Sequence, residues 1–199
     1  MSSQDKLFAV CLGGRAERCN TELHDVVFVT GASIEATYDQ LLDKWFGLPE
    51  GLHIDAWAEL DVVDGYEVSL ADAPDPGVQR LFFVNLGAYR PGELSEVHAN
   101  GVLVAATLQD AKRRAKATLL PGKVTELHTD DLYEVDACLE IGAVNGLHVV
   151  LTPTARQAEL KVTGSYHPLP EAVIEAWLNS FKAAHPGEGR DPGQIGGGI

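Results

Sequence analysis

The stretch LFAVCLGG at residues 7–14 returns as LFFVNLGA at residues 81–88, 74 positions later. The same offset relates TELH at 21–24 to SEVH at 95–98. Self-similarity at a fixed period is typical of a structural unit that has been copied along the chain. The sequence therefore predicts an internal duplication.

Two later pairs of segments extend the match at growing offsets. LHIDAWAELD at 52–61 aligns with LHTDDLYEVD at 127–136, and VDGYEVSL at 63–70 aligns with VNGLHVVL at 144–151. The offset is 75 for the first pair and 81 for the second. This change predicts short insertions, with the largest near residues 138–143.

The duplication divides the chain into two repeats followed by an extension. Repeat 1 is expected at 6–70 and repeat 2 at 80–151, joined by a Pro- and Gly-containing linker with no side chains suited to packing. A strand-and-helix extension is expected at 152–185. The Gly- and Pro-rich residues 186–199 are expected to be flexible.

Each repeat is expected to begin with a central strand. Residues 7–12 are apolar throughout, which is typical of a strand buried on both faces. The β-branched and aromatic segment 26–30 predicts a second strand. An amphipathic helix should follow, with Ser33 as its N-cap in repeat 1 and Thr107 in repeat 2. Gly47 is expected to end the first helix in a left-handed conformation.

A hairpin is expected to close each repeat. Asp64-Gly65 and Asn145-Gly146 are dipeptides that two-residue type I′ turns require, because both central residues need positive φ. The predicted fold class is therefore α+β, with two tandem β-β-α-β-β repeats resembling the β-grasp topology. The extension adds a strand within 158–166 and a helix that begins at Pro170.

Composition excludes several classes of partner. Lys and Arg total 15 against 29 Asp and Glu, a formal net charge of −14. Because nucleic-acid affinity depends on neutralising phosphates, we expect no nucleic-acid binding, and no binding to an anionic membrane. No apolar run is long enough for a signal peptide or a membrane span. Three cysteines without a C-x-x-C motif fit a cytoplasmic protein.

Two short patterns carry the candidate chemistry of repeat 1. Glu22 and His24 form Glu-x-His, and His53 and Asp55 form His-x-Asp; related pairs recur as Glu96/His98 and His128/Asp130. Residues two apart share a face of a strand, so each pair can converge. Two imidazoles and two carboxylates suit zinc, iron or manganese. The alternative is structural: the histidines bond loop backbone and the acids orient them.

Alternation along 53–62 predicts which face carries these side chains. Ile54, Ala56 and Ala58 belong to an apolar row that should meet the helix. His53, Asp55 and Trp57 belong to the opposite row, which is rich in acids and is expected to face solvent or a partner. Trp57 is a candidate anchor for a protein partner or for a homodimer formed through the open sheet face.

The motifs together resemble the bacterial domain-of-unknown-function family fifteen-forty-three. They are LGGR at 12–15, N-x-E-x-H-D at 20–25, L-H-I-D at 52–55 and V-D-G-Y at 63–66. The resemblance implies one or two copies of the domain and assigns no activity. Arg15, Asn20 and Asp25 are replaced in repeat 2 by Tyr89, Leu94 and Ala99, so a site would be intact only in repeat 1.

Two functions follow as hypotheses. The first is a cytoplasmic binding or interaction protein, and the alternative is a metal- or small-ligand-dependent enzyme using the His and carboxylate residues of repeat 1. The sequence identifies no cofactor. The predicted ligand-binding residues are Arg15, Asn20, Glu22, His24, Asp25, His53, Asp55 and Trp57, and the metal hypothesis uses Glu22, His24, His53 and Asp55.

Overall fold

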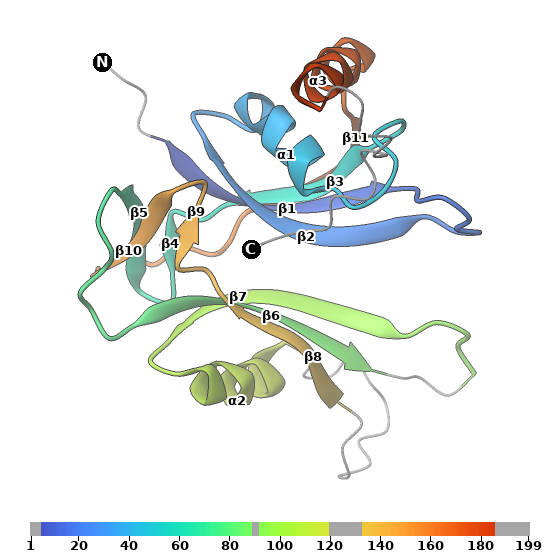
Figure 1. Cartoon of the computed structure of the whole chain (residues 1–199). Coiled ribbons are helices and arrows are strands. Elements are labelled where there is room, and N and C mark those ends of the chain that lie inside the picture. Colours follow the sequence, from blue (N-terminus) through green and yellow to red (C-terminus); the bar gives the residue numbers. More distant parts are fainter. Residues whose placement is uncertain (1–4, 89–91, 120–132, 186–199) are drawn as a thin grey trace. The chain divides into compact units, whose positions relative to one another are not determined.

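A computed structural model describes residues 5–88, 92–119 and 133–185 (Figure 1). Antiparallel sheets and short helices confirm the predicted α+β class. The chain divides into two compact units, one comprising residues 1–61 and 160–199 and the other residues 62–159. These units differ from the predicted repeats because the hairpin of repeat 1 belongs to the second unit. The predicted tail at 186–199 lies outside the described residues.

The first unit is built on a four-stranded sheet, called sheet A. Its order is β11 (Val162–Pro168), β3 (His53–Glu59), β1 (Lys6–Gly14) and β2 (Leu23–Gly31). All neighbouring strands are antiparallel. The central position of β1 agrees with its apolar sequence. The fourth strand comes from the C-terminal extension, whereas the sequence analysis expected it from the repeat's own hairpin.

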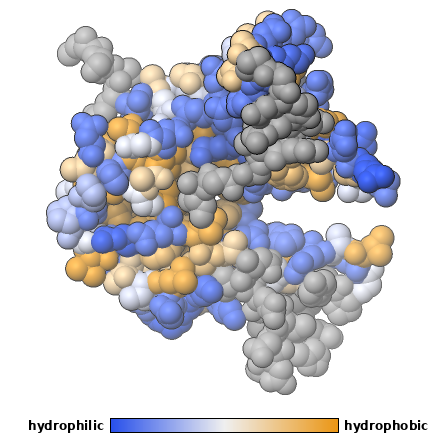
Figure 2. Space-filling model, viewed as in Figure 1, coloured by the Kyte–Doolittle hydropathy of each residue, from blue (hydrophilic) through white to orange (hydrophobic). Residues whose placement is uncertain are grey.

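Helices of the first unit lie on one side of sheet A (Figure 1). They are η1 (Glu35–Thr37), α1 (Tyr38–Lys44) and α3 (Glu171–Ala184). A core of strand and helix residues, including Leu12, Leu41 and Ile174, lies between the two layers. Hydrophilic residues cover the outer side of α3 (Figure 2). The opposite side of the sheet is called the open face of sheet A.

The start and end of the first helix differ from the prediction. Ser33 does not cap it: the chain enters through a 3-10 turn, and α1 begins after Thr37 without a side-chain cap. The Thr37 hydroxyl instead donates to the Ile34 carbonyl, 2.7 Å away. Gly47 has no positive φ. A side chain there would approach Nε1 of Trp45 to 2.7 Å, so Gly47 permits close packing rather than a left-handed cap.

The second unit contains an equivalent sheet, called sheet C. Its order is β7 (Val97–Ala105), β6 (Arg80–Ala88) and β8 (Tyr133–Glu140). Helix α2 (Leu108–Thr118) packs on it through Ala111 and Ala115. The predicted N-cap of this helix is confirmed, because the Thr107 hydroxyl accepts a hydrogen bond from the Asp110 amide at 3.2 Å.

The two predicted hairpins form a third sheet. Its strands are β4 (Val62–Val63), β5 (Tyr66–Ala71), β10 (Leu147–Pro153) and β9 (Ala143–Val144), in that order. Asp64 and Gly65 have φ of 52° and 80°, and Asn145 and Gly146 have φ of 51° and 81°. Both turns are therefore as predicted. The partners of the strands are not, because β5 pairs with β10 instead of with the sheet of its own repeat.

The pairing of β5 with β10 is nearly symmetric between the repeats. Ser69 pairs with Val150, which is its counterpart at the offset of 81. Val68 pairs with Leu151 and Leu70 with Val149, so each residue meets the counterpart of the other. This is the pattern of an isologous contact, in which equivalent surfaces meet across a two-fold axis. The third sheet is thus a self-complementary contact between the two copies of the hairpin.

Two aspartates attach the third sheet to its surroundings in the second unit. Oδ2 of Asp64 accepts a hydrogen bond from the Val104 amide at 2.9 Å and forms an ion pair with Arg114 at 2.8 Å. Oδ2 of Asp75 accepts a hydrogen bond from the Leu151 amide at 3.2 Å. Asp75 lies in the predicted linker. Its side chain holds that segment to strand β10, a contact that the sequence analysis did not identify.

Candidate functional site

Strand register brings the two predicted pairs together on sheet A. Gly13 of β1 pairs with His24 of β2 on one side and with His53 of β3 on the other. Paired residues of antiparallel strands share a face, so both imidazoles lie over a residue that has no side chain. A Cβ at Gly13 would collide with Nε2 of His53 and would lie 2.8 Å from Oδ2 of Asp55. Glycine at this position therefore provides the space for the cluster.

A β-bulge directs Asp55 into the same place. Cys11 pairs with Ala56 and Leu12 pairs with Ile54, so Asp55 is an extra residue in β3. Bulges change the direction of a side chain and occur next to functional sites. Here the bulge places the Asp55 carboxylate beside His53 and His24.

The same bulge corrects the predicted alternation along β3. Trp57 pairs with Val10 and packs with Ile54 against the core under the helices, so it lies on the helix side of the sheet. Its ring meets His167 edge-on at 5.0 Å. Trp57 therefore does not share a face with His53, and the predicted row on the open face does not include it. A strict period of two fails where a strand carries one extra residue.

Four side chains form what we call the first-repeat cluster: Glu22, His24, His53 and Asp55. Nε2 of His53 lies 3.0 Å from Oε1 of Glu22 and 3.5 Å from Oδ1 of Asp55. Nε2 of His24 lies 3.1 Å from Oδ2 of Asp55 and 3.9 Å from Oε2 of Glu22. The structure thus brings together the four residues of the metal hypothesis.

His53 is the fixed member of the cluster. Its side chain is 3% exposed, against 48% for Glu22 and 51% for His24. Nδ1 lies 2.9 Å from the Gly51 carbonyl, which assigns the proton to Nδ1 in the neutral ring. The Tyr166 ring of β11 lies against the imidazole, with 4.4 Å between centroids. Nε2 is buried and forms no hydrogen bond with any residue that the structure describes.

Three other predicted site residues are not among the side chains that contact His24 or His53 in the described part of the chain. Arg15 and Asn20 are exposed in the connection between β1 and β2. Asp25 pairs with Leu12 and therefore belongs to the helix side of sheet A. Burial raises the pKa of Asp25, although the Val26 amide, which donates to its carboxylate at 2.8 Å, lowers it. Asp25 therefore does not share the open face of sheet A with the first-repeat cluster.

Sequence reasoning missed three contributors. Gly13 was not singled out as a site residue, although its recurrence as Gly87 was a signal for close packing. Cys11 lies two residues before Gly13 and pairs with Ala56, so it faces the cluster. Burial, followed by the charges of Asp55 and Asp25, raises the pKa of the Cys11 thiol. Tyr166 belongs to the extension, for which the repeat offers no counterpart.

The register corrects which residues of repeat 2 correspond to the cluster. Gly87 pairs with His98 and with Glu134, so Glu134 holds the position of His53. Asp136 is the extra residue of the β8 bulge and holds the position of Asp55. The offset here is 81, so the alignment at 75 was wrong, and the insertion precedes β8. His128 and Asp130, which that alignment singled out, lie outside the described residues.

Repeat 2 carries a hydrogen-bonded row at the equivalent of Cys11. Nδ2 of Asn85 donates to Oδ1 of Asn100 at 2.6 Å, and Oδ1 of Asn85 lies 3.3 Å from Nδ1 of His98. Nε2 of His98 lies 3.8 Å from Glu96. The side-chain amides of Asn85 and Asn100 therefore bond to each other in repeat 2. Repeat 1 has a thiol and a valine, Cys11 and Val26, at the two equivalent positions.

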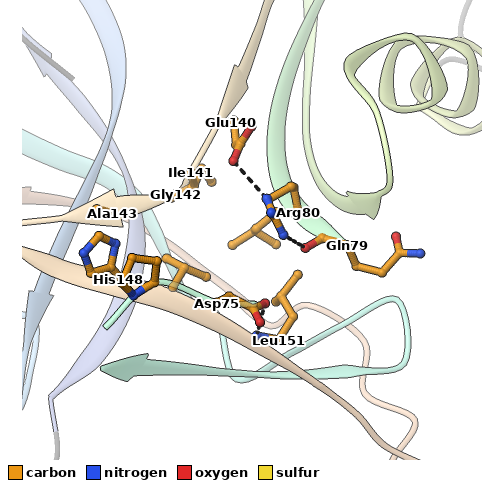
Figure 3. Close-up of a pocket in the computed structure, with 12 residues that line it drawn as sticks. Asp75, Gln79, Arg80, Glu140, Ile141, Gly142, Ala143, His148 and Leu151 are labelled. Atoms are coloured by element: carbon orange, nitrogen blue, oxygen red, sulfur yellow. Dashed lines mark hydrogen bonds and ion pairs between the residues drawn. The ribbon is translucent and has the colours of Figure 1, made fainter. Parts of the chain in front are cut away.

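A separate cavity of about 360 Å³ lies within the second unit (Figure 3). Arg80 forms an ion pair with Glu140 at 3.4 Å and donates to the Gln79 carbonyl at 2.8 Å. Asp75, which also lines the cavity, accepts a hydrogen bond from the amide of the neighbouring Leu151. These charged groups are engaged with the chain itself, so they join the linker to its neighbours. None of the predicted site residues lines this cavity.

A preformed metal-ion site and a membrane-spanning helix are both absent from the described residues. No group of three or more His, Cys, Asp or Glu side chains there is arranged as around a bound metal ion. No described helix combines the length and the apolar character needed to cross a membrane.

Comparisons with known proteins agree with the duplication. The sequence model of the family described as Domain of Unknown Function (DUF1543) matches residues 19–70 and 93–149, one segment in each repeat. The crystal structure of protein Il1583 from Idiomarina loihiensis is similar, with a TM-score of 0.64 and 34% identity, covering 84% of this chain and 99% of that one. No curated protein matches the chain. Strand β11 and its Tyr166 lie outside the family segments.

Proposed function

The chain belongs to the DUF1543 family, and we propose that it is a binding protein whose ligand site is the first-repeat cluster. The ligand is small, and it carries positive charge or donates hydrogen bonds. Its position is over Gly13 on the open face of sheet A, between His24 and His53.

One observation carries this proposal: the buried Nε2 of His53 has no hydrogen-bond partner among the described residues. An unsatisfied buried polar atom costs about 1–3 kcal/mol, so native proteins rarely retain one without a use. With the ring proton on Nδ1, Nε2 presents a lone pair. A ligand that supplies a proton or a cation to this lone pair would recover that free energy.

Charge supports a positive ligand. The atoms that surround Nε2 of His53 are carboxylate oxygens of Glu22 and Asp55, which accept hydrogen bonds and carry negative charge. The whole chain has a formal net charge of −14, which attracts cations and repels anions. Acceptors and negative charge at the same place disfavour phosphates and carboxylates as ligands.

The test is a binding screen with two classes of positive ligand. Divalent metal chlorides and small primary amines are added to the full chain, and the melting temperature and amide NMR shifts are recorded. We expect at least one class to bind saturably and to shift amides around Gly13. Binding should be lost in Glu22→Gln and Asp55→Asn, whose side chains are partly exposed and so tolerate substitution. It should persist in the matched repeat 2 variant Glu96→Gln. No saturable binding, or equal binding by all variants, would contradict the proposal.

A further inference from the structure

We propose that the ligand of the first-repeat cluster is a single divalent transition-metal ion of the zinc class. The proposed ligands are Nε2 of His24, Nε2 of His53 and one carboxylate oxygen each from Glu22 and Asp55. This inference rests on the proposed function and identifies the ligand at that site.

Distances between the donor atoms distinguish a metal ion from an ammonium group. Tetrahedral zinc with bonds of 2.0–2.1 Å separates neighbouring ligand atoms by about 3.3 Å. An ammonium held by hydrogen bonds of about 2.8 Å would separate its acceptors by about 4.6 Å. With Oε1 of Glu22 and Oδ2 of Asp55 as the carboxylate ligands, the separations are 3.0 Å to Nε2 of His53 and 3.1 Å to Nε2 of His24. Both are near the value for a metal ion and well below the value for an ammonium.

The short contact between His53 and Glu22 gives an independent argument. Nε2 of His53 is 3.0 Å from Oε1 of Glu22, yet the two atoms form no hydrogen bond. With the ring proton on Nδ1, Nε2 has no N–H to donate, so both atoms are acceptors. Two acceptors this close repel each other unless a cation lies near both, so the contact favours a bound positive ion.

The surroundings of His53 are those of a metal-binding histidine. Metal-ligating imidazoles usually donate the other ring N–H to a carbonyl or carboxylate, which fixes the tautomer. Nδ1 of His53 lies 2.9 Å from the Gly51 carbonyl. The Tyr166 ring against the imidazole restricts its rotation. Gly13 leaves the space in front of Nε2 without a Cβ.

Metal binding requires movement in part of the cluster. No three donors in the described part of the chain surround a common point as they would around an ion. Glu22 and His24 have side chains about half exposed, so they are able to turn toward the fixed His53. Two imidazoles favour zinc, cobalt, iron or manganese over magnesium and calcium, which prefer all-oxygen sites.

Cobalt(II) provides the direct test, because a tetrahedral cobalt site with nitrogen ligands absorbs visible light. The full chain is stripped with a chelator, titrated with cobalt chloride, and then titrated with zinc chloride by calorimetry. We expect one ion per chain, tetrahedral absorption bands, and displacement of cobalt by zinc. Glu22→Gln and Asp55→Asn should each lower zinc affinity at least tenfold. His98→Gln, the matched variant in repeat 2, should leave it unchanged.

The outcomes separate this inference from the proposed function. Saturable binding of ethylamine without cobalt or zinc binding would overturn the metal and leave the binding site standing. Binding of neither class would overturn both. Equal zinc affinity in Glu22→Gln, Asp55→Asn and the unaltered chain would place any metal elsewhere and overturn the inference. Circular dichroism of each stripped variant confirms that it is folded before titration.

Discussion

Sheet A and sheet C have the same strand register but carry different chemistry at the same place. Gly13 lies between His24 and His53, whereas Gly87 lies between His98 and Glu134. In repeat 1 a buried imidazole nitrogen has no hydrogen-bond partner among the described residues. In repeat 2 the row of Asn85, Asn100 and His98 is internally bonded. The two repeats therefore keep the same strand pairing, while the polar side chains of this row bond to one another in repeat 2.

The comparison also explains the C-terminal extension. In the described residues, sheet C has three strands, and sheet A has a fourth strand, β11, that pairs with β3. That strand places the Tyr166 ring against His53. Helix α3 adds Ile174 to the core of the first unit, and the Trp177 indole donates a hydrogen bond to Asp43 of α1 at 2.7 Å. The extension supports the repeat that carries the cluster.

The largest effect is expected from Gly13→Ala. A Cβ at this position collides with Nε2 of His53, so the imidazole must move, and overpacking of this kind costs about 1–3 kcal/mol. Ligand binding should be abolished and the urea midpoint lowered. Gly164→Ala in β11 is the control, because nothing lies within 4 Å of its Cβ position. Normal binding by Gly13→Ala would show that the space above this residue has no role.

The next effect is expected at Asp64, which attaches the repeat 1 hairpin within the second unit. Asp64→Ala leaves the Val104 amide without its acceptor and places alanine at a φ of 52°. We expect a loss of about 2 kcal/mol in the free energy of unfolding, most of it from the amide and the turn. The ion pair with Arg114 adds little because both side chains are a third or more exposed.

Asp64→Asn separates these contributions. Asparagine tolerates positive φ and keeps a carbonyl oxygen that can accept from Val104, so it should cost less than half as much as alanine. Chemical denaturation of both variants provides the measurement. Equal losses for alanine and asparagine would mean that the charge, not the turn or the amide, attaches the hairpin.

A smaller effect on stability is expected at the N-termini of helices α1 and α2, which differ in capping. Thr107→Ala removes a hydroxyl that accepts from the Asp110 amide and should cost about 1 kcal/mol. Ser33→Ala should cost clearly less, because the first helix has no side-chain cap. Paired thermal or urea unfolding curves test this difference. A larger loss for Ser33→Ala than for Thr107→Ala would refute it.

The smallest effect uses Cys11 as a reporter of the cluster. Burial, then the charges of Asp55 and Asp25, raises its pKa, so at pH 7.5 less of it is thiolate than in a free cysteine. Asp55→Asn removes one of these charges, so the pKa falls, the thiolate fraction rises, and alkylation by iodoacetamide becomes a few-fold faster. Cys138, which lies in the second unit, is the internal control, because its pKa is raised mainly by burial. Slower or unchanged labelling of Cys11 would count against its orientation toward Asp55.

Local chemistry in the sequence predicted much of the fold. The apolar run of β1, the Asp64-Gly65 and Asn145-Gly146 turns and the Thr107 cap each depend on a few adjacent residues, and all three are present. The partner of β5 was not predictable in this way. Its pairing with β10 joins residues about 80 positions apart, and nothing in the alternation of either strand selects one partner over the other.

The candidate site was predicted in composition but not in geometry. Glu22, His24, His53 and Asp55 were named from two short motifs, and the register of β1 brought them together. The bulge at Asp55 was hidden, because a strict period of two also fits the sequence, and it moved Trp57 to the other face. Glu134 as the counterpart of His53 required the pairing itself, because sequence similarity favoured His128.

The most direct test of the account is the nitrogen-15 spectrum of the histidine rings during a zinc titration of the full chain. Before zinc, His53 should show the tautomer protonated at Nδ1, with Nε2 unprotonated. On titration, Nε2 of His53 and Nε2 of His24 should shift together and saturate at one zinc per chain, while His98 stays unchanged. Saturation with His53 unmoved, or with His98 moving in parallel, would contradict the claim that repeat 1 alone carries the binding site.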